Sequence, residues 1–172
     1  MEKREGWKDK SQLPNQVRYL RENPRVQGSV FFSSKSLTDN LAGFQDSLRS
    51  NLYCFPALQP PMLWLDNVAP QAPLELKGFL TAPTSVQLSW KEPFKSRDGE
   101  TAYGYVIYRF IAGEELNIED PAHILKISFD NQSTSFVDNT VQKSSRYVYL
   151  VTAIDRLKNE SMPSNQIYII TF

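Results

Sequence analysis

One cysteine and one histidine, Cys54 and His123, are the residues of this 172-residue chain best suited to nucleophilic or metal chemistry. A single cysteine permits no internal disulfide and excludes cysteine-rich zinc sites. A Cys–His catalytic pair is arithmetically possible. Free cysteine is among the most buried residue types, so we interpret Cys54 as a small core side chain. His123 follows a proline-containing turn and precedes an apolar run, which predicts an exposed loop side chain.

Carboxylates gather in one short segment, which holds Glu114, Glu115, Glu119 and Asp120. Calcium prefers oxygen ligands of this kind, but the spacing matches no calcium-binding loop. We therefore predict a solvated acidic loop, no metal site and no cofactor.

Positive and negative charges balance, with 19 Lys and Arg against 19 Asp and Glu. Such a balance gives no support for binding to nucleic acid or to an anionic membrane surface. No stretch approaches the roughly 18 consecutive apolar residues of a membrane helix, so no membrane span is expected. The first eight residues are charged and lack the apolar core of a signal peptide. The location of the protein is therefore not readable from the chain itself.

The most regularly patterned stretch is residues 146–155, where both alternating sets of side chains are largely apolar. The period of two predicts a strand, and apolar residues in both sets predict cover on both faces. Six other short runs with strand-like character share the region, with turn residues between them. The seven expected strands are 74–80, 85–90, 103–111, 124–129, 135–138, 146–155 and 166–172. We therefore predict a mainly β fold whose domain 74–172 is a seven-stranded immunoglobulin-like sandwich.

Residues 1–65 follow another pattern, and a linker at 66–73 separates them from the sandwich. The expected elements are a helix that begins after residues 12–14, a strand at 28–34, a helix at 41–49 and a proline-stiffened segment at 53–65. A single strand between two helices leaves backbone groups unpaired on both edges and cannot form a domain alone. We therefore expect this part to be incomplete.

Several motifs of the sandwich region resemble those of fibronectin type III domains. The run 85–93, Ser-Val-Gln-Leu-Ser-Trp-Lys-Glu-Pro, resembles the second strand of that family, and 104–109 resembles the third. The alternating tyrosines and small apolar residues of 147–155 resemble the sixth strand, and Ser-Met-Pro-Ser at 161–164 resembles the approach to the last. The resemblance covers about residues 73–172.

The fibronectin resemblance implies structural roles for two of its aromatic residues. Trp90 would pack in the core, and Tyr147 would form a tyrosine corner, in which the hydroxyl bonds to backbone a few residues upstream. The alternation of the third strand places Tyr105 on the inward face as a third structural residue. Arg-Leu-Lys-Asn occupies 156–159 where a glycine turn is usual, so we expect Lys158 or Asn159 to be left-handed.

Four runs of the first part, at 13–17, 28–36, 43–48 and 56–66, resemble the end of the catalytic domain of bacterial glycosyl-hydrolase-like family 10 proteins. Those proteins are (β/α)8 barrels, often followed by a β-sandwich. The resemblance, which spans about residues 1–66, implies that 28–34 is the last barrel strand and 41–49 the last helix.

The barrel resemblance also implies a place for Ser33, Ser34 and Lys35. They would stand at the C-terminal end of a barrel strand, where such enzymes build their active sites. In the intact barrel these residues would either line the substrate site or simply begin the loop to the next helix, and both alternatives stay open. Glycoside hydrolysis needs two carboxylates, and no Asp or Glu lies between Gln27 and Thr38. We therefore expect no catalytic residue in this chain and no activity from it alone.

These inferences predict a non-catalytic C-terminal accessory or structural module of a bacterial, secreted or cell-envelope, glycosyl-hydrolase-like protein. Its partner would be the rest of its own barrel, and glycans would be reached through the parent protein. The alternatives are a carbohydrate- or protein-binding module that uses exposed aromatic side chains, and an enzyme in its own right. Val30, Phe31 and Phe32 are expected to lie against the sandwich, the proline-rich segment or a second copy of the chain.

Overall fold

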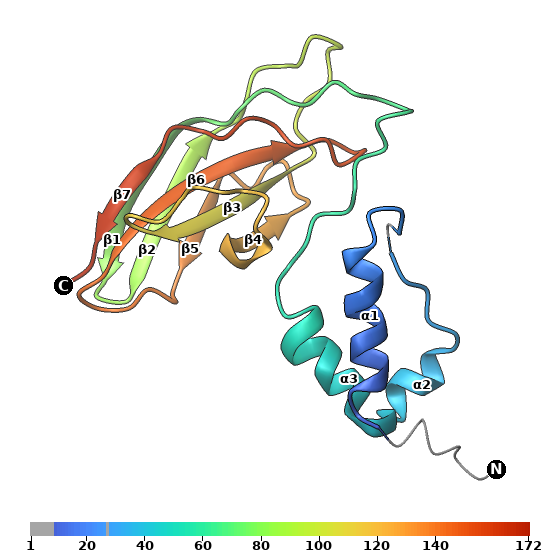
Figure 1. The fold of residues 1–172 in the computed structure, drawn as a ribbon. Helices are drawn as coiled ribbons and strands as arrows, with labels where there is room; N and C mark the ends of the chain where they lie inside the picture. Colours follow the sequence, from blue (N-terminus) through green and yellow to red (C-terminus); the bar gives the residue numbers. More distant parts are fainter. Residues whose placement is uncertain (1–8, 27) are drawn as a thin grey trace. The chain divides into compact units, whose positions relative to one another are not determined.

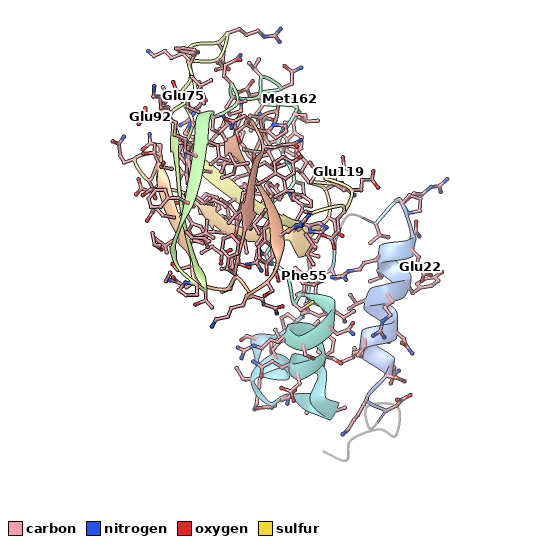
Figure 2. The ribbon with its side chains drawn as sticks, turned by 90° about the vertical axis from the view of Figure 1, so that its left-hand side faces the viewer. Glu22, Phe55, Glu75, Glu92, Glu119 and Met162 are labelled. Carbon is pink, nitrogen blue, oxygen red and sulfur yellow. The ribbon has the colours of Figure 1, made fainter. Side chains whose placement is uncertain are left out.

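The computed structural model describes residues 9–26 and 28–172. The chain divides into two compact units, of which one ends at Cys54 and the other begins at Phe55 (Figures 1 and 2). The division falls before the proline-rich segment, whereas the sequence-based limits placed residues 55–65 with the first domain. The segment belongs with the sandwich because it makes contacts there, as described below.

Helical segments form the described part of the first unit. They are α1 (Gln12–Glu22), α2 (Ser34–Thr38), η2 (Leu41–Gly43), α3 (Phe44–Ser47) and η3 (Leu48–Leu52). Val17, Phe44 and Leu52 are buried, and Leu13, Leu37 and Leu48 pack against them. Asn40 lies before the turns that lead into α3, and its Oδ1 accepts the backbone N–H of Gln45 near the start of that helix at 3.0 Å. Both predicted helices therefore form, although the second is broken into shorter turns.

The strand expected at residues 28–34 is absent from the described residues of this unit. Val30 and Phe32 are 99% and 98% exposed, while Phe31 packs its ring 5.4 Å from that of Phe44. The Phe32–Ser33 peptide bond is cis. A strand needs a neighbour to satisfy its backbone groups, and the described part of this unit supplies none. Val30 and Phe32 are thus uncovered in the single chain, whereas Phe31 contacts Phe44 of the small core.

The second unit is an antiparallel β-sandwich (Figure 1). Within residues 55–172 its strands are β1 (Leu74–Ala82), β2 (Ser85–Lys91), β3 (Gly104–Ile111), β4 (Ile124–Ser128), β5 (Ser135–Asp138), β6 (Arg146–Ile154) and β7 (Ile167–Ile170), with a short turn η4 (Pro121–His123) before β4. One sheet has the order β1-β2-β5 and the other β4-β3-β6-β7. The predicted fold class and all seven expected strands are confirmed.

The core between the sheets is built from alternate side chains of facing strands. Leu88 and Trp90 of β2 meet Tyr105 of β3 and Tyr149 and Val151 of β6, and all five are buried. The rings of Trp90 and Tyr105 meet edge to face, with centroids 5.4 Å apart. Such an aromatic pair stabilises the core through the apolar area that it buries and through the favourable arrangement of its two rings.

A second apolar layer covers the outer face of the four-stranded sheet. Val106, Tyr108 and Phe110 of β3 and Val148 and Leu150 of β6 form its buried part, and partly buried residues of the 112–118 loop pack on them. The strand β6 is therefore buried on both faces, as its sequence predicted. Because both faces are covered, both alternating sets of its side chains are apolar, as is usual for strands of a parallel sheet.

The proline-rich segment runs as a strap against this second layer. Leu58 packs on the outer-face cluster. The backbone N–H of Met62 donates to the carbonyl of Leu157 at 3.1 Å, and Asn159 Nδ2 donates to the carbonyl of Asp66 at 3.2 Å. The strap is thereby fixed to the turn that follows β6.

Two local geometries match the fibronectin-type motifs. The backbone N–H of Gln142 donates to the Tyr147 hydroxyl at 3.0 Å, which is the arrangement of a tyrosine corner. Lys158 has φ of 71°, the left-handed conformation expected where this chain lacks a glycine. Asp155 braces that turn by accepting from the backbone N–H of Asn159 at 2.9 Å.

Two sequence-based interpretations of single residues are wrong. Cys54 is exposed, because it follows η3 at the point where the chain leaves the small core of the first unit. His123 is half-buried rather than exposed, since its ring stacks on that of Phe110 with centroids 4.3 Å apart. Among the described residues, no helix is long and apolar enough to cross a membrane.

Candidate functional site

Ser33, Ser34 and Lys35 stand at the start of the short helix α2. Ser33 precedes its first turn in extended conformation and its side chain makes no capping hydrogen bond, and Ser34 and Lys35 are the first two helical residues. All three are exposed. None of them lines the cavities described below, and no carboxylate is present in this helix. The substrate-lining role implied by the barrel resemblance stays a prediction.

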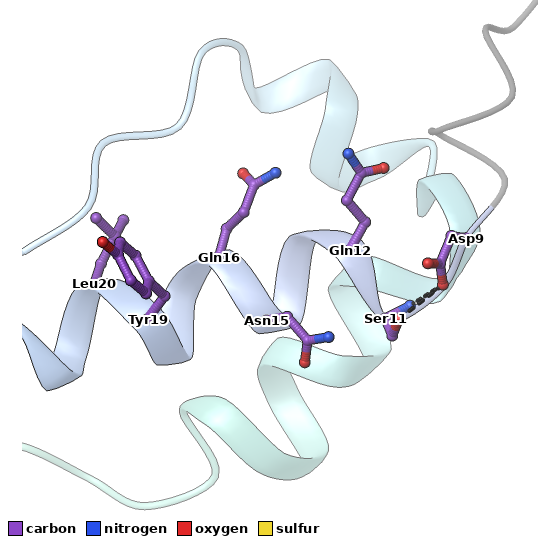
Figure 3. A pocket seen from close by; sticks show the side chains of 7 residues that line it. All are labelled: Asp9, Ser11, Gln12, Asn15, Gln16, Tyr19 and Leu20. Atoms are coloured by element: carbon purple, nitrogen blue, oxygen red, sulfur yellow. Dashed lines mark hydrogen bonds between the residues drawn. The ribbon is translucent and has the colours of Figure 1, made fainter.

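An open hollow lies along one face of α1 (Figure 3). Its volume is about 540 Å³, and it is lined by Asp9, Ser11, Gln12, Asn15, Gln16, Tyr19 and Leu20. Asp9 accepts hydrogen bonds from the backbone N–H and the hydroxyl of Ser11, both at 2.8 Å. Those bonds, first the backbone one, lower the pKa of the Asp9 carboxyl. Asp9 is the one acid in this lining, so a carboxylate pair for hydrolysis is not formed here.

A more enclosed cavity lies at one end of the sandwich, among the connections between strands. We call it the loop-end cavity. Its volume is about 240 Å³, and it is lined by Glu92, Pro93, Thr101, Ala102, Tyr105, Asn131 and Gln132. Glu92 directly follows β2 (Figure 2), and Asn131 and Gln132 lie between β4 and β5. Tyr105 of β3 and the β2–β3 and β4–β5 connections therefore contribute to one small polar cavity.

A second cavity adjoins the first and shares Thr101, Ala102 and Asn131 with it. Its volume is about 410 Å³, and the rest of its lining is Lys95, Gly99, Glu100, Tyr103 and Arg156. The ring of Tyr103 lies 6.2 Å from that of Phe129, and the Lys158 ammonium sits 4.8 Å and 4.3 Å from the two ring centroids. This rim thus presents two partly exposed rings under a cation.

The loop that borders both cavities is held by its own hydrogen bonds. The Asp98 carboxylate accepts from the Ser96 hydroxyl and, at 3.1 Å, from the backbone N–H of Glu100. The Ser96 hydroxyl bond is the main reason that the pKa of Asp98 is lowered. Gly99 has φ of 88°, which the Asp-Gly turn requires. The loop therefore has a defined shape beside the cavities.

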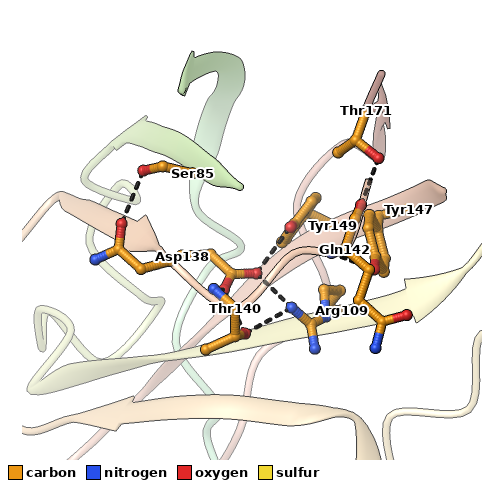
Figure 4. A network of polar contacts seen from close by, with 9 residues as sticks. Ser85, Arg109, Asp138, Thr140, Gln142, Tyr147, Tyr149 and Thr171 are labelled. Atoms are coloured by element: carbon orange, nitrogen blue, oxygen red, sulfur yellow. Dashed lines mark hydrogen bonds and ion pairs between the residues drawn. The ribbon is translucent and has the colours of Figure 1, made fainter. Parts of the chain in front are cut away.

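A separate buried network joins the two sheets (Figure 4). Asp138 at the end of β5 accepts from Arg109 Nη1 and from the Tyr149 hydroxyl, both at 2.8 Å, and from the hydroxyl and N–H of Thr140. Both carboxylate oxygens of Asp138 thus accept hydrogen bonds. The bonds connect β3 and β6 of one sheet with β5 of the other through one buried carboxylate.

Within residues 9–26 and 28–172, no group of three or more His, Cys, Asp and Glu side chains could hold a metal ion. The arrangement that sequence reasoning missed is the loop-end cavity. Apart from Tyr105 of β3, its residues come from two connections, β2–β3 and β4–β5, that carry no periodic pattern. The one available signal was the polar loop 94–101 with its Asp-Gly turn, which predicts a turn but not its neighbours.

No family model matches the chain. It is 34% identical over 160 residues to the glycosyl hydrolase YngK of Bacillus subtilis, and the matched stretch covers 93% of this chain and 30% of that protein. It is 33% identical over 135 residues to an amylopullulanase of Thermoanaerobacterium thermosulfurigenes, and the matched stretch covers 76% of this chain and 6% of that protein. The chain therefore spans less than a third of either curated relative.

Solved structures similar to the sandwich include domains A168–A170 of titin, with 22% identity and a TM-score of 0.48 over 61% of this chain and 34% of that chain. A Fn3-like protein from Clostridium thermocellum is 19% identical with a TM-score of 0.46, over 60% of this chain and 95% of that chain. The fold assignment rests on the strand order and motifs of the chain itself.

Proposed function

From a fibronectin type III sandwich preceded by a segment that resembles the end of a glycosyl-hydrolase-like barrel, we propose that this chain is a non-catalytic C-terminal accessory module of a bacterial, extracytoplasmic, glycosyl-hydrolase-like protein. The helical unit completes a (β/α)8 barrel, and the sandwich follows it. Similarity to a named glycosyl hydrolase over 93% of the chain, but only 30% of that relative, supports this assignment.

The observation that carries the proposal is the exposure of Val30 and Phe32. These side chains occupy the run that reads as a doubly buried strand, yet the described helical unit provides nothing to cover them. A barrel strand between two neighbours would bury both faces and pair its backbone groups. Full burial of a Val or Phe side chain contributes about 1.5–3 kcal/mol, so the two residues favour this docking.

The residues that catalyse glycoside hydrolysis then lie in the rest of the barrel. Ser33, Ser34 and Lys35 would lie at the end of the completed strand and line the substrate site there, while the two carboxylates come from other strands. Glycan contact then belongs to the parent protein. The chain alone hydrolyses no glycoside.

Substitution of the apolar run tests the docking. The double variant Val30→Asp, Phe32→Asp should leave the melting of this chain by itself unchanged, since both residues are exposed in it. In the longer protein that includes the preceding barrel, the same variant should lower the melting temperature and the glycosidase activity. Thr84→Asp, at an exposed position in the turn between β1 and β2, serves as a charge control. An unchanged longer protein would refute the docking.

A further inference from the structure

The strap ends in a turn at residues 62–65, which we call the strap turn. The backbone N–H groups of Leu65 and Asp66 close it by donating to the carbonyl of Met62, at 2.9 Å and 3.3 Å. Both of its ends are bonded to the sandwich beside the turn that follows β6 (Figure 1). The Asn159 amide at one of these ends is itself fixed, because its Nδ2 donates to the buried Asp155 carboxylate at 2.7 Å. The strap turn therefore has a defined place on the sandwich.

The strap turn exposes consecutive apolar side chains. The exposed fraction is 79% for Trp64, 64% for Leu65, 59% for Leu63 and 41% for Met62. Leu58, earlier in the strap, is half-buried against the sandwich, so the strap covers an apolar side chain where the sandwich offers a surface. Single exposed apolar residues are common, but a contiguous run on a fixed turn is typical of an interaction site.

The composition of the strap turn favours an apolar partner surface. No charged residue lies between Cys54 and Asp66, so a nucleic acid or another highly charged surface would find no ionic partner there. Tryptophan is prominent among the residues that dominate protein–protein interfaces, because its large ring buries much area at a low cost in conformational entropy. Trp64, the most exposed of the four side chains, is thus the expected centre of the contact.

The covalent connection favours one partner among apolar surfaces. Residues 53–61 separate η3 from the strap turn, and a segment of that length spans at most about 30 Å. The proposed function makes η3 part of a barrel, which therefore lies within reach. A tethered partner has a high effective concentration, whereas a second copy or a separate protein pays the full entropic cost of association. The stretch matched in the named glycosyl hydrolase includes 93% of this chain, so both units occur together in that protein.

We propose that the strap turn docks on an apolar patch of the barrel that precedes it in the longer protein, with Trp64 at the centre of the contact and Leu63 and Leu65 beside it. This inference rests on the proposed function, because the barrel supplies the partner surface. It concerns a surface of the sandwich, however, and not the apolar run at 28–34. The sandwich is then seated against the barrel instead of being carried on a loose linker.

Hydroxyl-radical oxidation followed by mass spectrometry tests the docking, because a side chain reacts faster when more of it is exposed. Trp64 should be oxidised about tenfold more slowly in the longer protein than in the 172-residue chain, since burial at an interface centre removes nearly all of its exposure. This slowing should not depend on protein concentration. Phe94, which is 74% exposed in the connection between β2 and β3, is the internal control and should react equally in both proteins.

The variant Trp64→Ser gives a second measurement. It should leave the melting of the 172-residue chain unchanged, because the side chain is largely exposed there. In the longer protein it should lower the melting temperature by several degrees, whereas the matched Phe94→Ser should not. Equal oxidation of Trp64 in both proteins, or equal melting of the two variants in the longer protein, would overturn the docking. Slower oxidation that appears in the chain alone as its concentration rises would also overturn it, because the partner would then be a second copy.

Amide exchange of residues 28–34 in the longer protein separates this inference from the proposed function. Protection of that segment while Trp64 stays reactive would leave the barrel strand intact and overturn the strap-turn docking alone. Slow oxidation of Trp64 without protection of the segment would support the docking and overturn the barrel strand. An unprotected segment together with a reactive Trp64 would overturn both.

Discussion

Arg109 of β3 and Asp138 of β5 form an ion pair across the two sheets, with Nη1 2.8 Å from Oδ2. The Asp138 side chain is 1% exposed and that of Arg109 22%. The Tyr149 hydroxyl donates to the same Oδ2 at 2.8 Å, and Thr140 donates to Oδ1 (Figure 4). The sheets are therefore tied together by a charged group whose oxygens are all satisfied, in addition to the apolar core.

Asp138→Asn removes the charge that this network is built around. We expect a loss of about 3 kcal/mol in the free energy of unfolding, because a buried pair that loses one partner leaves the other charge poorly compensated. Chemical denaturation of the purified chain measures the change. The exposed Glu119→Gln provides the control and should stay within about 0.5 kcal/mol of the unsubstituted chain. Equal stability of the two variants would show that the pair does not hold the sheets.

The same carboxylate makes stability depend on pH. Burial disfavours ionisation of Asp138, but hydrogen bonds from Thr140 and Tyr149 and the charge of Arg109 outweigh it and lower its pKa from 3.8. A depressed folded-state pKa contributes stability above the unfolded value, which is lost as the pH falls through the folded one. Denaturation at pH 6 and at acid pH below 3.8 should show this loss in the unsubstituted chain. A variant Asp138→Asn with the same acid dependence would contradict the assignment.

The tyrosine corner predicts a modest and purely structural effect. Tyr147→Phe removes the acceptor of the Gln142 N–H but keeps the ring beneath Arg109, whose guanidinium carbon lies 5.0 Å from the ring centroid. We expect about 1 kcal/mol of destabilisation, the net value of one hydrogen bond. Thermal melting measures it, with Tyr168→Phe as the control. Equal melting of Tyr147→Phe and the unsubstituted chain would show that this hydrogen bond does not stabilise the sandwich.

Gly104 is required by close approach of two strands. A Cβ added there would lie 2.1 Å from the backbone carbonyl oxygen of Ser128, so β4 would have to move. Gly104→Ala should therefore destabilise the chain by about 3 kcal/mol, the upper end of overpacking effects. Gly28→Ala is the matched control, because nothing lies within 4 Å of its added Cβ. Similar melting of both variants would exclude the steric account.

The sandwich could be predicted because the pattern that indicates each strand lies within one short stretch of the sequence. A period of two marks each strand, and the doubly apolar set in β6 predicted the layer on its outer face. The failures have a common physical cause, which is dependence on distant neighbours. Residues 28–34 have strand composition but no strand beside them in the described unit, and Cys54 is small and apolar yet lies where its core ends. The loop-end cavity arises where two unpatterned connections meet beside β3, which no single stretch encodes.

We propose above that residues 28–34 become a barrel strand in the longer protein. Amide hydrogen exchange of this segment tests it most directly, because exchange reports whether backbone groups are paired. In the chain alone the segment should exchange rapidly, while the β6 amides are protected and serve as the internal standard. In the protein that includes the preceding barrel, the segment should become as protected as β6. Equally rapid exchange of residues 28–34 in both proteins would contradict the proposed barrel strand.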